Sequence, residues 1–177
     1  IDYVQGGFIV GEDAQAGKNP YHHAGAYYMQ DPGAMASVAA LPEALWEQKN
    51  LKILDVCAAP GGKTTQLAAL CRPNGGAVVA NEYVSARSRI LAGNVERMGL
   101  DNVMVTNVDS KYLAEWYPTY FDLVAVDAPC SGEGMYRKTD LAITEWSPEN
   151  VKMCAARQAE ILENAAKTVA PSGYLLY

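Results

Sequence analysis

One cysteine of this chain lies in a setting that suits covalent chemistry. The apolar run 121–126 leads directly into Asp127–Gly132, DAPCSG, which places an acid and Cys130 close together. A run of this kind is typical of a buried strand, and the end of a strand can present a side chain to a ligand. A thiolate is a strong nucleophile, and a nearby carboxylate can orient a substrate by hydrogen bonding. Cys130 and Asp127 are therefore candidate catalytic residues.

A second motif predicts a ligand-binding loop. Residues Leu51–Thr65 read LKILDVCAAPGGKTT, an apolar run followed by glycines and the start of a helix pattern. A strand, a glycine turn and a helix in that order present unpaired backbone N–H groups and the positive end of a helix dipole to a ligand. Lys63 stands where the helix begins, and it joins the candidate catalytic and ligand-binding residues.

Three acids follow predicted strands and complete the candidate site. Glu82 comes roughly 20 residues after Gly61, the spacing at which an acid contacts ribose hydroxyls in dinucleotide-binding folds. We expect no basic neighbour at Glu82, which leaves both oxygens for a ribose. Asp109 follows the third strand, where it can meet an adenine amino group, and Asp127 follows the fourth. Because ligands bind outside the carboxyl ends of parallel strands, these acids predict one site.

Two nucleotide-binding alternatives compete for the glycine loop. Gly62-Lys63-Thr64 resembles the end of a phosphate-binding P-loop, but that motif needs a glycine where Cys57 stands. The GxGxxG fingerprint of nicotinamide-binding folds is also missing. A nucleoside without phosphates suits this loop better, and a P-loop-like nucleotide-binding protein is kept as an alternative.

The elements that must position these residues alternate along the chain. Apolar runs predict five buried strands, at 52–56, 77–80, 103–106, 121–126 and 174–177. Strands alternating with helices are typical of a parallel sheet covered on both faces, so we predict an α/β, Rossmann-like doubly wound fold. Residues 1–34, rich in Gly and Tyr, do not follow this pattern. They predict an N-terminal extension packed on a Rossmann-like domain of residues 35–177.

Capping signals predict the bounds of two helices. Ser85 is expected to cap a helix that Gly99 ends. Ser147 is expected to cap the last helix, whose apolar positions continue with a 3.6-residue period as far as Val169. Pro171 is expected to end it.

Composition narrows the class of protein. The chain has 177 residues, half of them apolar and 19% charged, which suits one domain with a sizeable core. No apolar run is long enough to span a membrane, and no secretion leader opens the sequence. The four cysteines form no CxxC pair and lack zinc-ligand spacing. We therefore predict free thiols in a reducing cytoplasm and no bound metal.

Charge limits the role of nucleic acid as a partner. The net charge of −6 argues against a freestanding nucleic-acid binder, which needs clustered Lys and Arg. Two basic groups stay open as local patches or as solvated surface. They are Arg87, Arg89 and Arg97 in one segment, and Arg137–Lys138 after the cysteine motif.

Several motifs together resemble one known family. They read, in order, DVCAAPGGKTTQLA, NEYVSARSRIL, GNVERMGLDNVMVTNVDS and FDLVAVDAPCSGEGMYRK, and AYYMQDPGAMASVAAL precedes them at Ala26–Leu41. In sequence and spacing they resemble the Sun-type (NOL/NOP/Sun) RNA cytosine-C5 methyltransferases over most of residues 20–177. The stretch CSGEGMYRK is most similar to the bacterial branch that modifies small-subunit ribosomal RNA.

The resemblance implies a class I methyltransferase sheet that binds S-adenosyl-L-methionine. By position, Ala58–Lys63 would wrap the methionine part, Glu82 would bind the ribose and Asp109 the adenine. Asp127 would lie where the cofactor and the target cytosine meet, with Lys63 steadying the base or the cofactor. The implied cofactor-binding residues are Ala58, Ala59, Pro60, Gly61, Gly62, Lys63, Glu82, Asp109 and Asp127.

The resemblance also implies a reaction: methyl transfer to C5 of a cytosine in RNA, expected to be ribosomal RNA, through a cysteine adduct at C6. In the family the attacking cysteine belongs to a Thr-Cys pair after the fifth strand. The DAPCSG cysteine, here Cys130, assists product release. The chain stops at Tyr177, so we expect a catalytic-domain fragment, truncated after the fifth strand and inactive alone, with RNA-binding domains outside it. A non-catalytic module that binds cofactor or RNA is the alternative.

Overall fold

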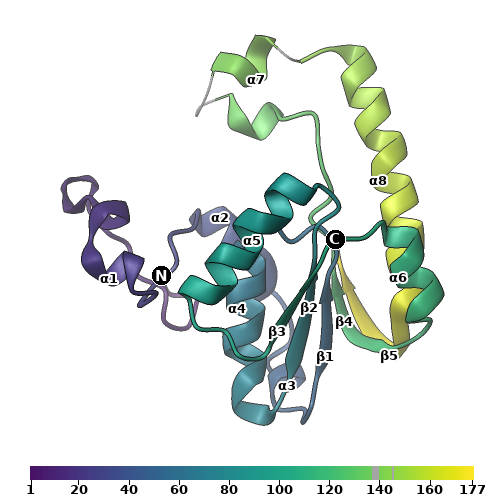
Figure 1. Ribbon diagram of the computed structural model, residues 1–177, viewed down its shortest axis with the longest axis horizontal. Coiled ribbons are helices and arrows are strands. Elements are labelled where there is room, and N and C mark those ends of the chain that lie inside the picture. The colour runs from purple at the N-terminus through teal and green to yellow at the C-terminus, as the bar shows by residue number, and fades with distance from the viewer. Residues whose placement is uncertain (137–139, 145) are drawn as a thin grey trace.

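The computed structural model contains a five-stranded parallel sheet with helices on both faces (Figure 1). The structure describes residues 1–136, 140–144 and 146–177. The strands lie in the order β3-β2-β1-β4-β5, and each neighbouring pair is parallel. The strand order reverses between β1 and β4, so the loops after these two strands open side by side. The predicted α/β, doubly wound sheet is confirmed.

The elements have the following bounds. The strands are β1 Lys52–Asp55, β2 Ala77–Asn81, β3 Val103–Thr106, β4 Phe121–Ala125 and β5 Val169–Leu176. The longer helices are α2 Pro32–Ala39, α4 Gly62–Cys71, α5 Ser85–Arg97, α6 Ser110–Trp116 and α8 Pro148–Thr168. The short elements are α1 Pro20–His23, α3 Glu43–Trp46, α7 Asp140–Thr144, η1 Glu12–Ala14, η2 Ala16–Lys18, η3 Arg72–Asn74 and η4 Glu133–Met135. None of the helices in the described ranges is long and apolar enough to cross a membrane.

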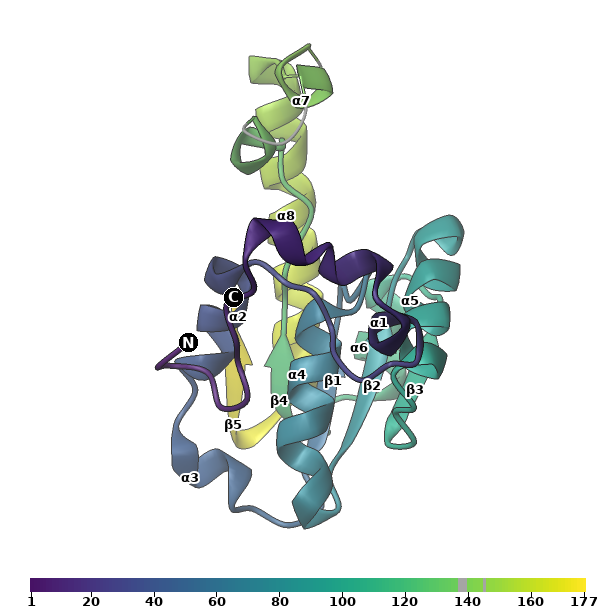
Figure 2. The same cartoon turned by 90° about the vertical axis from the view of Figure 1, so that its left-hand side faces the viewer.

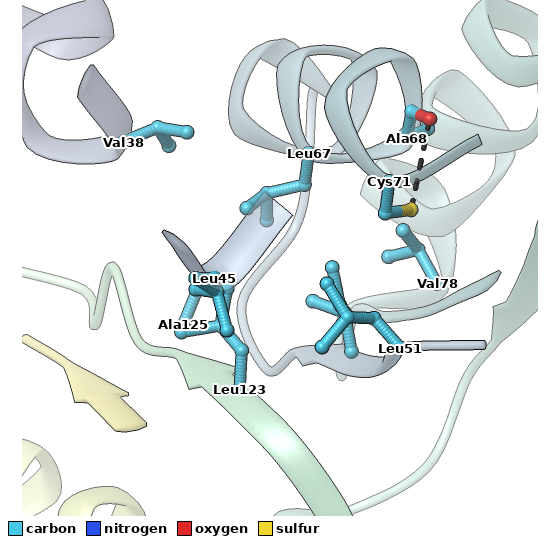
Figure 3. Packing of buried hydrophobic residues seen from close by; sticks show 10 residues of the cluster. Val38, Leu45, Leu51, Leu67, Ala68, Cys71, Val78, Leu123 and Ala125 are labelled. Carbon is cyan, nitrogen blue, oxygen red and sulfur yellow. Dashed lines mark hydrogen bonds between the residues drawn. The ribbon is translucent and has the colours of Figure 1, made fainter. Parts of the chain in front are cut away.

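Alternate residues of the central strands face opposite layers. Ile53 of β1 and Leu123 of β4 belong to a buried cluster with Leu67 of α4, part of which Figure 3 shows. Leu54 and Val124, one residue further along, belong to a second cluster with α6 and α8. Because both faces are buried, the strands read as continuous apolar runs rather than as alternating ones. The helices therefore hold the sheet from both sides and fix the loops at its carboxyl edge.

The start of α5 differs from its prediction. Ser85 is the first residue of the helix and makes no capping bond, and Val84 holds the cap position. The Val84 N–H donates instead to Oε1 of Glu82 at 2.9 Å. The bond from Val84 fixes the Glu82 side chain just before the helix, and α5 begins without a side-chain cap. Gly99 comes directly after the C-cap with φ +61°, as predicted for the residue that ends this helix.

The junction between α8 and β5 also differs. Ser147 caps α8 as predicted, with its hydroxyl accepting a backbone N–H at 3.1 Å. The helix ends at Thr168, and Val169 begins the strand, so Pro171 lies inside β5 instead of ending the helix. The pairing of β4 with β5 contains a register shift, and an irregular strand at the sheet edge is a place that accepts proline.

The N-terminal segment reaches α5, as Figure 2 shows. Arg97 of α5 donates from Nη1 to the carbonyl of His22 at 2.6 Å, and its guanidinium lies 5.9 Å from the centroid of the Tyr28 ring. Gly25 has φ +78°, and a Cβ there would lie 1.9 Å from the carbonyl oxygen of Arg97. Only glycine allows the two backbones to approach so closely.

Gly25→Ala is expected to loosen the N-terminal segment. Its Cβ must displace a backbone carbonyl, in addition to the ~1–2 kcal/mol that a left-handed conformation costs an L-residue. Gly6→Ala is the matched control, because Gly6 has φ +73° but open space around its Cβ. Hydrogen–deuterium exchange of residues 19–30 should become roughly tenfold faster in Gly25→Ala and stay unchanged in Gly6→Ala. Equal exchange in both variants would contradict this close packing.

The basic residues that the sequence left open take different positions. Arg97 donates a hydrogen bond to the N-terminal segment, and Arg87 donates one to the loop of the candidate site described below. Arg89 is exposed and is solvated surface. Arg137–Lys138 lies outside the described residues.

Candidate cofactor-binding and catalytic site

The loop after β1 is fixed by backbone bonding and by packing. The Ala58 N–H donates to the carbonyl of Asn81 in β2 at 2.8 Å, and both Ala58 and Ala59 are buried against Leu91 of α5. Gly61 caps α4 with φ +114°, and a Cβ there would lie 3.2 Å from Cδ1 of Leu91. Backbone conformation and space therefore both favour glycine at the point where the loop enters the helix.

The first turn of α4 carries one member of a charged pair. Nζ of Lys63 lies 2.7 Å from Oδ2 of Asp127, which follows β4. The Lys63 side chain is 18% exposed and the Asp127 side chain 64% exposed, so a mostly buried lysine side chain holds a carboxylate that faces solvent. The structure thus brings two of the predicted catalytic residues into contact across the β1–β4 switch point.

Asp55 is a buried acid beneath this loop. Its Oδ2 accepts a hydrogen bond from Oγ1 of Thr64 at 2.7 Å, whereas Oδ1 is buried and has no hydrogen-bond partner among the described residues. Burial raises the pKa of Asp55 to about 6; the Thr64 bond and the Lys63 cation oppose this rise, and the carboxylates of Asp127 and Glu82 add to it. Asp55 therefore titrates near neutral pH.

Asp55→Asn is expected to change how stability depends on pH. Because the pKa of Asp55 is higher in the folded than in the unfolded chain, its stabilising contribution is complete below about pH 4 and is lost as pH rises through about 6. The unfolding free energy of wild type relative to Asp55→Asn should fall by about 2–3 kcal/mol between about pH 4 and pH 7.5. Urea unfolding of both proteins at several pH values measures it. A difference independent of pH would contradict this role of burial.

Glu82 is a buried acid directly after β2, with 3% of its surface exposed. Val84 N–H satisfies Oε1, while Oε2 is buried and accepts no hydrogen bond from the described residues. Nη2 of Arg87 lies 3.6 Å from Oε2 and donates to the carbonyl of Ala59 at 2.8 Å. The expectation of no basic neighbour is therefore wrong. Arg87 lies in the first turn of α5, and the direction of this turn brings its guanidinium group next to the Glu82 carboxylate. The order of residues in the sequence does not reveal this contact.

Asn81, which the sequence analysis missed, ties the strand ends together. This residue is 1% exposed and comes last in β2. Its Nδ2 donates to the carbonyls of Val56 and Val108, each at 3.1 Å, and its Oδ1 accepts from Oγ1 of Thr106 at 2.9 Å. The loops after β1 and β3 are thereby fixed to β2. The one signal in the sequence was a polar residue at the end of an apolar run, directly before Glu82.

Asp109 lies in the connection after β3 and caps α6. Its Oδ1 accepts from the Lys111 N–H at 3.0 Å, and the residue is half-buried. Two residues earlier, Nδ2 of Asn107 donates to the carbonyl of Glu82 at 2.6 Å, which joins this connection to the end of β2. Asp109 thus stands at the same edge as Glu82, and its role in helix capping uses one of its two oxygens.

Cys130 is exposed in the loop after β4. Gln158 of α8 donates from Nε2 to the carbonyl of Pro129 at 2.9 Å and so holds the backbone beside the thiol. Cys57, at the end of the neighbouring strand, is half-buried, and burial together with nearby carboxylates raises its pKa to about 12. Of these two thiols, only that of Cys130 is open to a substrate.

The arrangement fits a ligand that carries a nucleoside. Oε2 of Glu82 is a buried acceptor without a donor, and a ribose hydroxyl is a donor of the required kind. Arg87 links the Glu82 carboxylate to the glycine loop, and Asn107 links the Glu82 backbone to the connection that bears Asp109. In residues 1–136, 140–144 and 146–177, no three His, Cys, Asp or Glu side chains are grouped so that they could hold a metal ion.

A parallel sheet in this strand order, with helices on both faces and a glycine loop after its central strand, defines the class I S-adenosylmethionine-dependent methyltransferase fold. The structure of NSun6 from Pyrococcus horikoshii with SFG superposes on this chain with a TM-score of 0.73 at 25% identity, and the match covers 90% of this chain and 39% of that one. Within this class, the chain belongs to the 16S rRNA methyltransferase RsmB/F family, whose profile matches residues 42–177. The predicted resemblance is confirmed.

Two curated relatives show the same membership. The ribosomal RNA small subunit methyltransferase F of Aeromonas salmonicida (strain A449) is 42% identical over 166 residues, which cover 94% of this chain and 35% of the relative. The protein of the same name from Vibrio vulnificus (strain YJ016) is 39% identical over 180 residues, covering 100% of this chain and 38% of the relative. The chain thus spans a little over a third of the length of these relatives.

Proposed function

We propose that this chain forms the cofactor-binding part of an enzyme that transfers a methyl group from S-adenosylmethionine to C5 of a cytosine in ribosomal RNA. The observation that carries the proposal is the buried Glu82 carboxylate, whose Oε2 lacks a hydrogen-bond donor. It lies at the sheet edge that also presents the Lys63–Asp127 pair. Membership of the RsmB/F family and the names of the relatives support ribosomal RNA as the substrate.

Each part of the cofactor has a matching group in this proposal. The loop Ala58–Lys63 binds the methionine part through backbone N–H groups and the N-terminal turn of α4. Glu82 accepts hydrogen bonds from the ribose hydroxyls, and Asp109 accepts one from the adenine amino group. The neighbour solved with SFG, an S-adenosylmethionine analogue, supports this ligand. When bound, S-adenosylmethionine supplies an electrophilic methyl group.

The target carbon needs activation before it can accept that methyl group. C5 of cytosine is a weak nucleophile, so a thiolate first adds to C6 and the displaced electron pair makes C5 enamine-like, with N3 taking a proton from solvent and returning it once C5 has bonded to the methyl carbon. C5 then bonds to the methyl carbon while the bond between that carbon and the sulfonium sulfur breaks. Loss of the C5 proton to a base forms the C5–C6 double bond and expels the thiolate.

The residues of this chain take supporting roles in that sequence. Asp127 accepts a hydrogen bond from the 4-amino group of the base, and Lys63, 2.7 Å away, holds the carboxylate in place. Cys130 assists release of the methylated product. The attacking thiol comes from the Thr-Cys pair that the family carries after its fifth strand. The exposed position of Cys130, and the Gln158 bond to Pro129 beside it, support a thiol held ready for the substrate.

Calorimetric titration of the chain with S-adenosylmethionine, and separately with Mg-ATP, tests the proposed function. We expect S-adenosylmethionine to bind and Mg-ATP not to bind. Tight Mg-ATP binding without S-adenosylmethionine binding would overturn the proposal in favour of a P-loop-like protein. Cofactor binding without methylation, in a longer protein that carries the Thr-Cys pair, would instead indicate a non-catalytic module that binds cofactor or RNA.

We also propose that residues 1–34 form an extension on a catalytic domain of residues 35–177. The bond from Arg97 to the carbonyl of His22 supports this packing. Helix α2 begins before residue 34 and ends after it, so a helix connects the two parts.

A further inference from the structure

One guanidinium group contacts both halves of the proposed cofactor site. Arg87 lies in the first turn of α5, and its Nη2 donates to the carbonyl of Ala59 at 2.8 Å. The same nitrogen lies 3.6 Å from Oε2 of Glu82. Ala59 belongs to the loop proposed for the methionine part, and Glu82 is the acid proposed for the ribose. Arg87 therefore joins the two halves directly.

The burial of Glu82 gives this contact its importance. The residue is 3% exposed, and the Val84 N–H satisfies only its Oε1. A carboxylate removed from water is costly unless an opposite charge compensates it, and Arg87 supplies that charge. At 3.6 Å the guanidinium is beyond hydrogen-bond distance, so Oε2 keeps its capacity to accept a hydroxyl proton.

A second side chain of α5 holds the next carbonyl of the loop. Nδ2 of Asn94 donates to the carbonyl of Pro60 at 2.8 Å. Arg97 donates to Oδ1 of Asn94 at 3.3 Å from Nη2, which orients the Asn94 amide. Two successive loop carbonyls, those of Ala59 and Pro60, are thus bonded to α5. Carbonyls held by the helix cannot turn toward the ligand. The loop can then present its N–H donors to the carboxylate of the methionine part of the cofactor.

We propose that Arg87 is a positioning residue for S-adenosylmethionine, an inference that rests on the proposed function. It holds the loop at Ala59 and the acid at Glu82 in a fixed relation, so that the methionine part and the ribose of the cofactor are bound together. It acts through these two groups and needs no contact with the cofactor itself. Its effect on affinity should therefore depend on the presence of the Glu82 carboxylate.

Calorimetric titration with S-adenosylmethionine tests this role. Arg87→Gln is expected to raise the Kd roughly 10- to 100-fold, because the loop loses a charge-assisted bond and Glu82 loses its counter-charge. Arg89→Gln is the matched control: Arg89 lies on the same helix, is exposed, and has no ion pair or hydrogen bond within the described part of the chain. Its Kd should stay within about twofold of wild type. Arg87→Lys should be intermediate, since an ammonium group reaches one partner but not both.

A double-mutant cycle separates positioning from a general loss of structure. In a Glu82→Gln background, Arg87→Gln should cost several-fold less than in wild type, because the charge that Arg87 compensates is already gone and only the bond to the Ala59 carbonyl is lost. Equal losses in both backgrounds, or wild-type affinity in Arg87→Gln, would overturn the inference while leaving the proposed function intact. Failure of the wild-type chain to bind S-adenosylmethionine would instead overturn the proposed function. Thermal unfolding of each variant reports whether the fold is retained.

Discussion

Glu82→Ala is expected to weaken S-adenosylmethionine binding roughly 30- to 1,000-fold. The physical reason is the loss of two charge-assisted hydrogen bonds from the ribose hydroxyls, worth about 2–4 kcal/mol together. Glu82 suits this role because it is buried at the end of β2 with Oε2 free of hydrogen bonds. The neighbouring Arg87 strengthens the expectation, since removal of the acid leaves a guanidinium facing the site without its counter-charge. Calorimetric titration of wild type and variant measures the change.

Two further variants make this measurement specific. Glu82→Gln keeps the size of the side chain and one acceptor oxygen but loses the charge, so its affinity should lie between those of wild type and Glu82→Ala. Glu96→Ala removes an exposed acid elsewhere on α5 and should bind like wild type. Mg-ATP should bind poorly to all of them. Wild-type affinity in Glu82→Ala would remove the ribose role from this residue.

The strands were predictable because buried strands consist mainly of apolar residues, which stand out as runs in the sequence. Lys52–Asp55 and Phe121–Ala125 each end one residue before the predicted bound, and Val103–Thr106 agrees fully. A strand covered on both faces needs apolar residues at every position, and that signal is local. The first part of β5 was not predictable in this way. Its pairing contains a register shift around Pro171, and the pattern of α8 continues into it without a break.

The candidate site was predictable to the level of strand ends and no further. The contact between Lys63 and Asp127 follows from topology, since two loops at one switch point must meet. The contact of Arg87 with Glu82 depends on where α5 begins and on the direction its side chains take, and the predicted start was wrong by one residue. Local patterns do not contain that information.

The contacts of the N-terminal segment were likewise not predictable from local sequence patterns, and here the contacting residues are further apart in the chain. Its contact with α5 depends on the close approach of Gly25 to the backbone of Arg97, residues far apart in the sequence. A glycine in a loop with many glycines gives no local sign of which backbone it will meet. The sequence likewise left Arg97 open between a local basic patch and solvated surface, whereas its guanidinium donates to the carbonyl of His22. Pairings of this kind are properties of the folded chain.

Replacing Cys130 is expected to trap RNA rather than to prevent attack on it. If Cys130 assists product release, a protein that carries both Cys130 and the Thr-Cys pair should still attack C6 and methylate C5 after Cys130→Ala. The adduct should then accumulate with ordinary cytosine RNA, because release stalls. A denaturing gel should change from no detectable protein–RNA band to a major one. Cys154→Ala, which removes a buried thiol of α8, is the control and should give no such band.

The present chain provides the converse test of Cys130. A fluorine at C5 cannot leave as a proton does, so RNA containing 5-fluorocytosine holds any attacking thiol as a stable adduct in the presence of S-adenosylmethionine. Because the proposed attacker is the cysteine of the Thr-Cys pair, and Cys57 is kept protonated by its raised pKa of about 12, this chain should form no adduct. Cys130 is exposed, so a base can reach its thiol. The experiment can therefore contradict the prediction, because no residue in the described part of the chain shields Cys130 from the base. A 5-fluorocytosine adduct mapped to Cys130 by peptide mass spectrometry would make it the nucleophile and reverse the proposed roles.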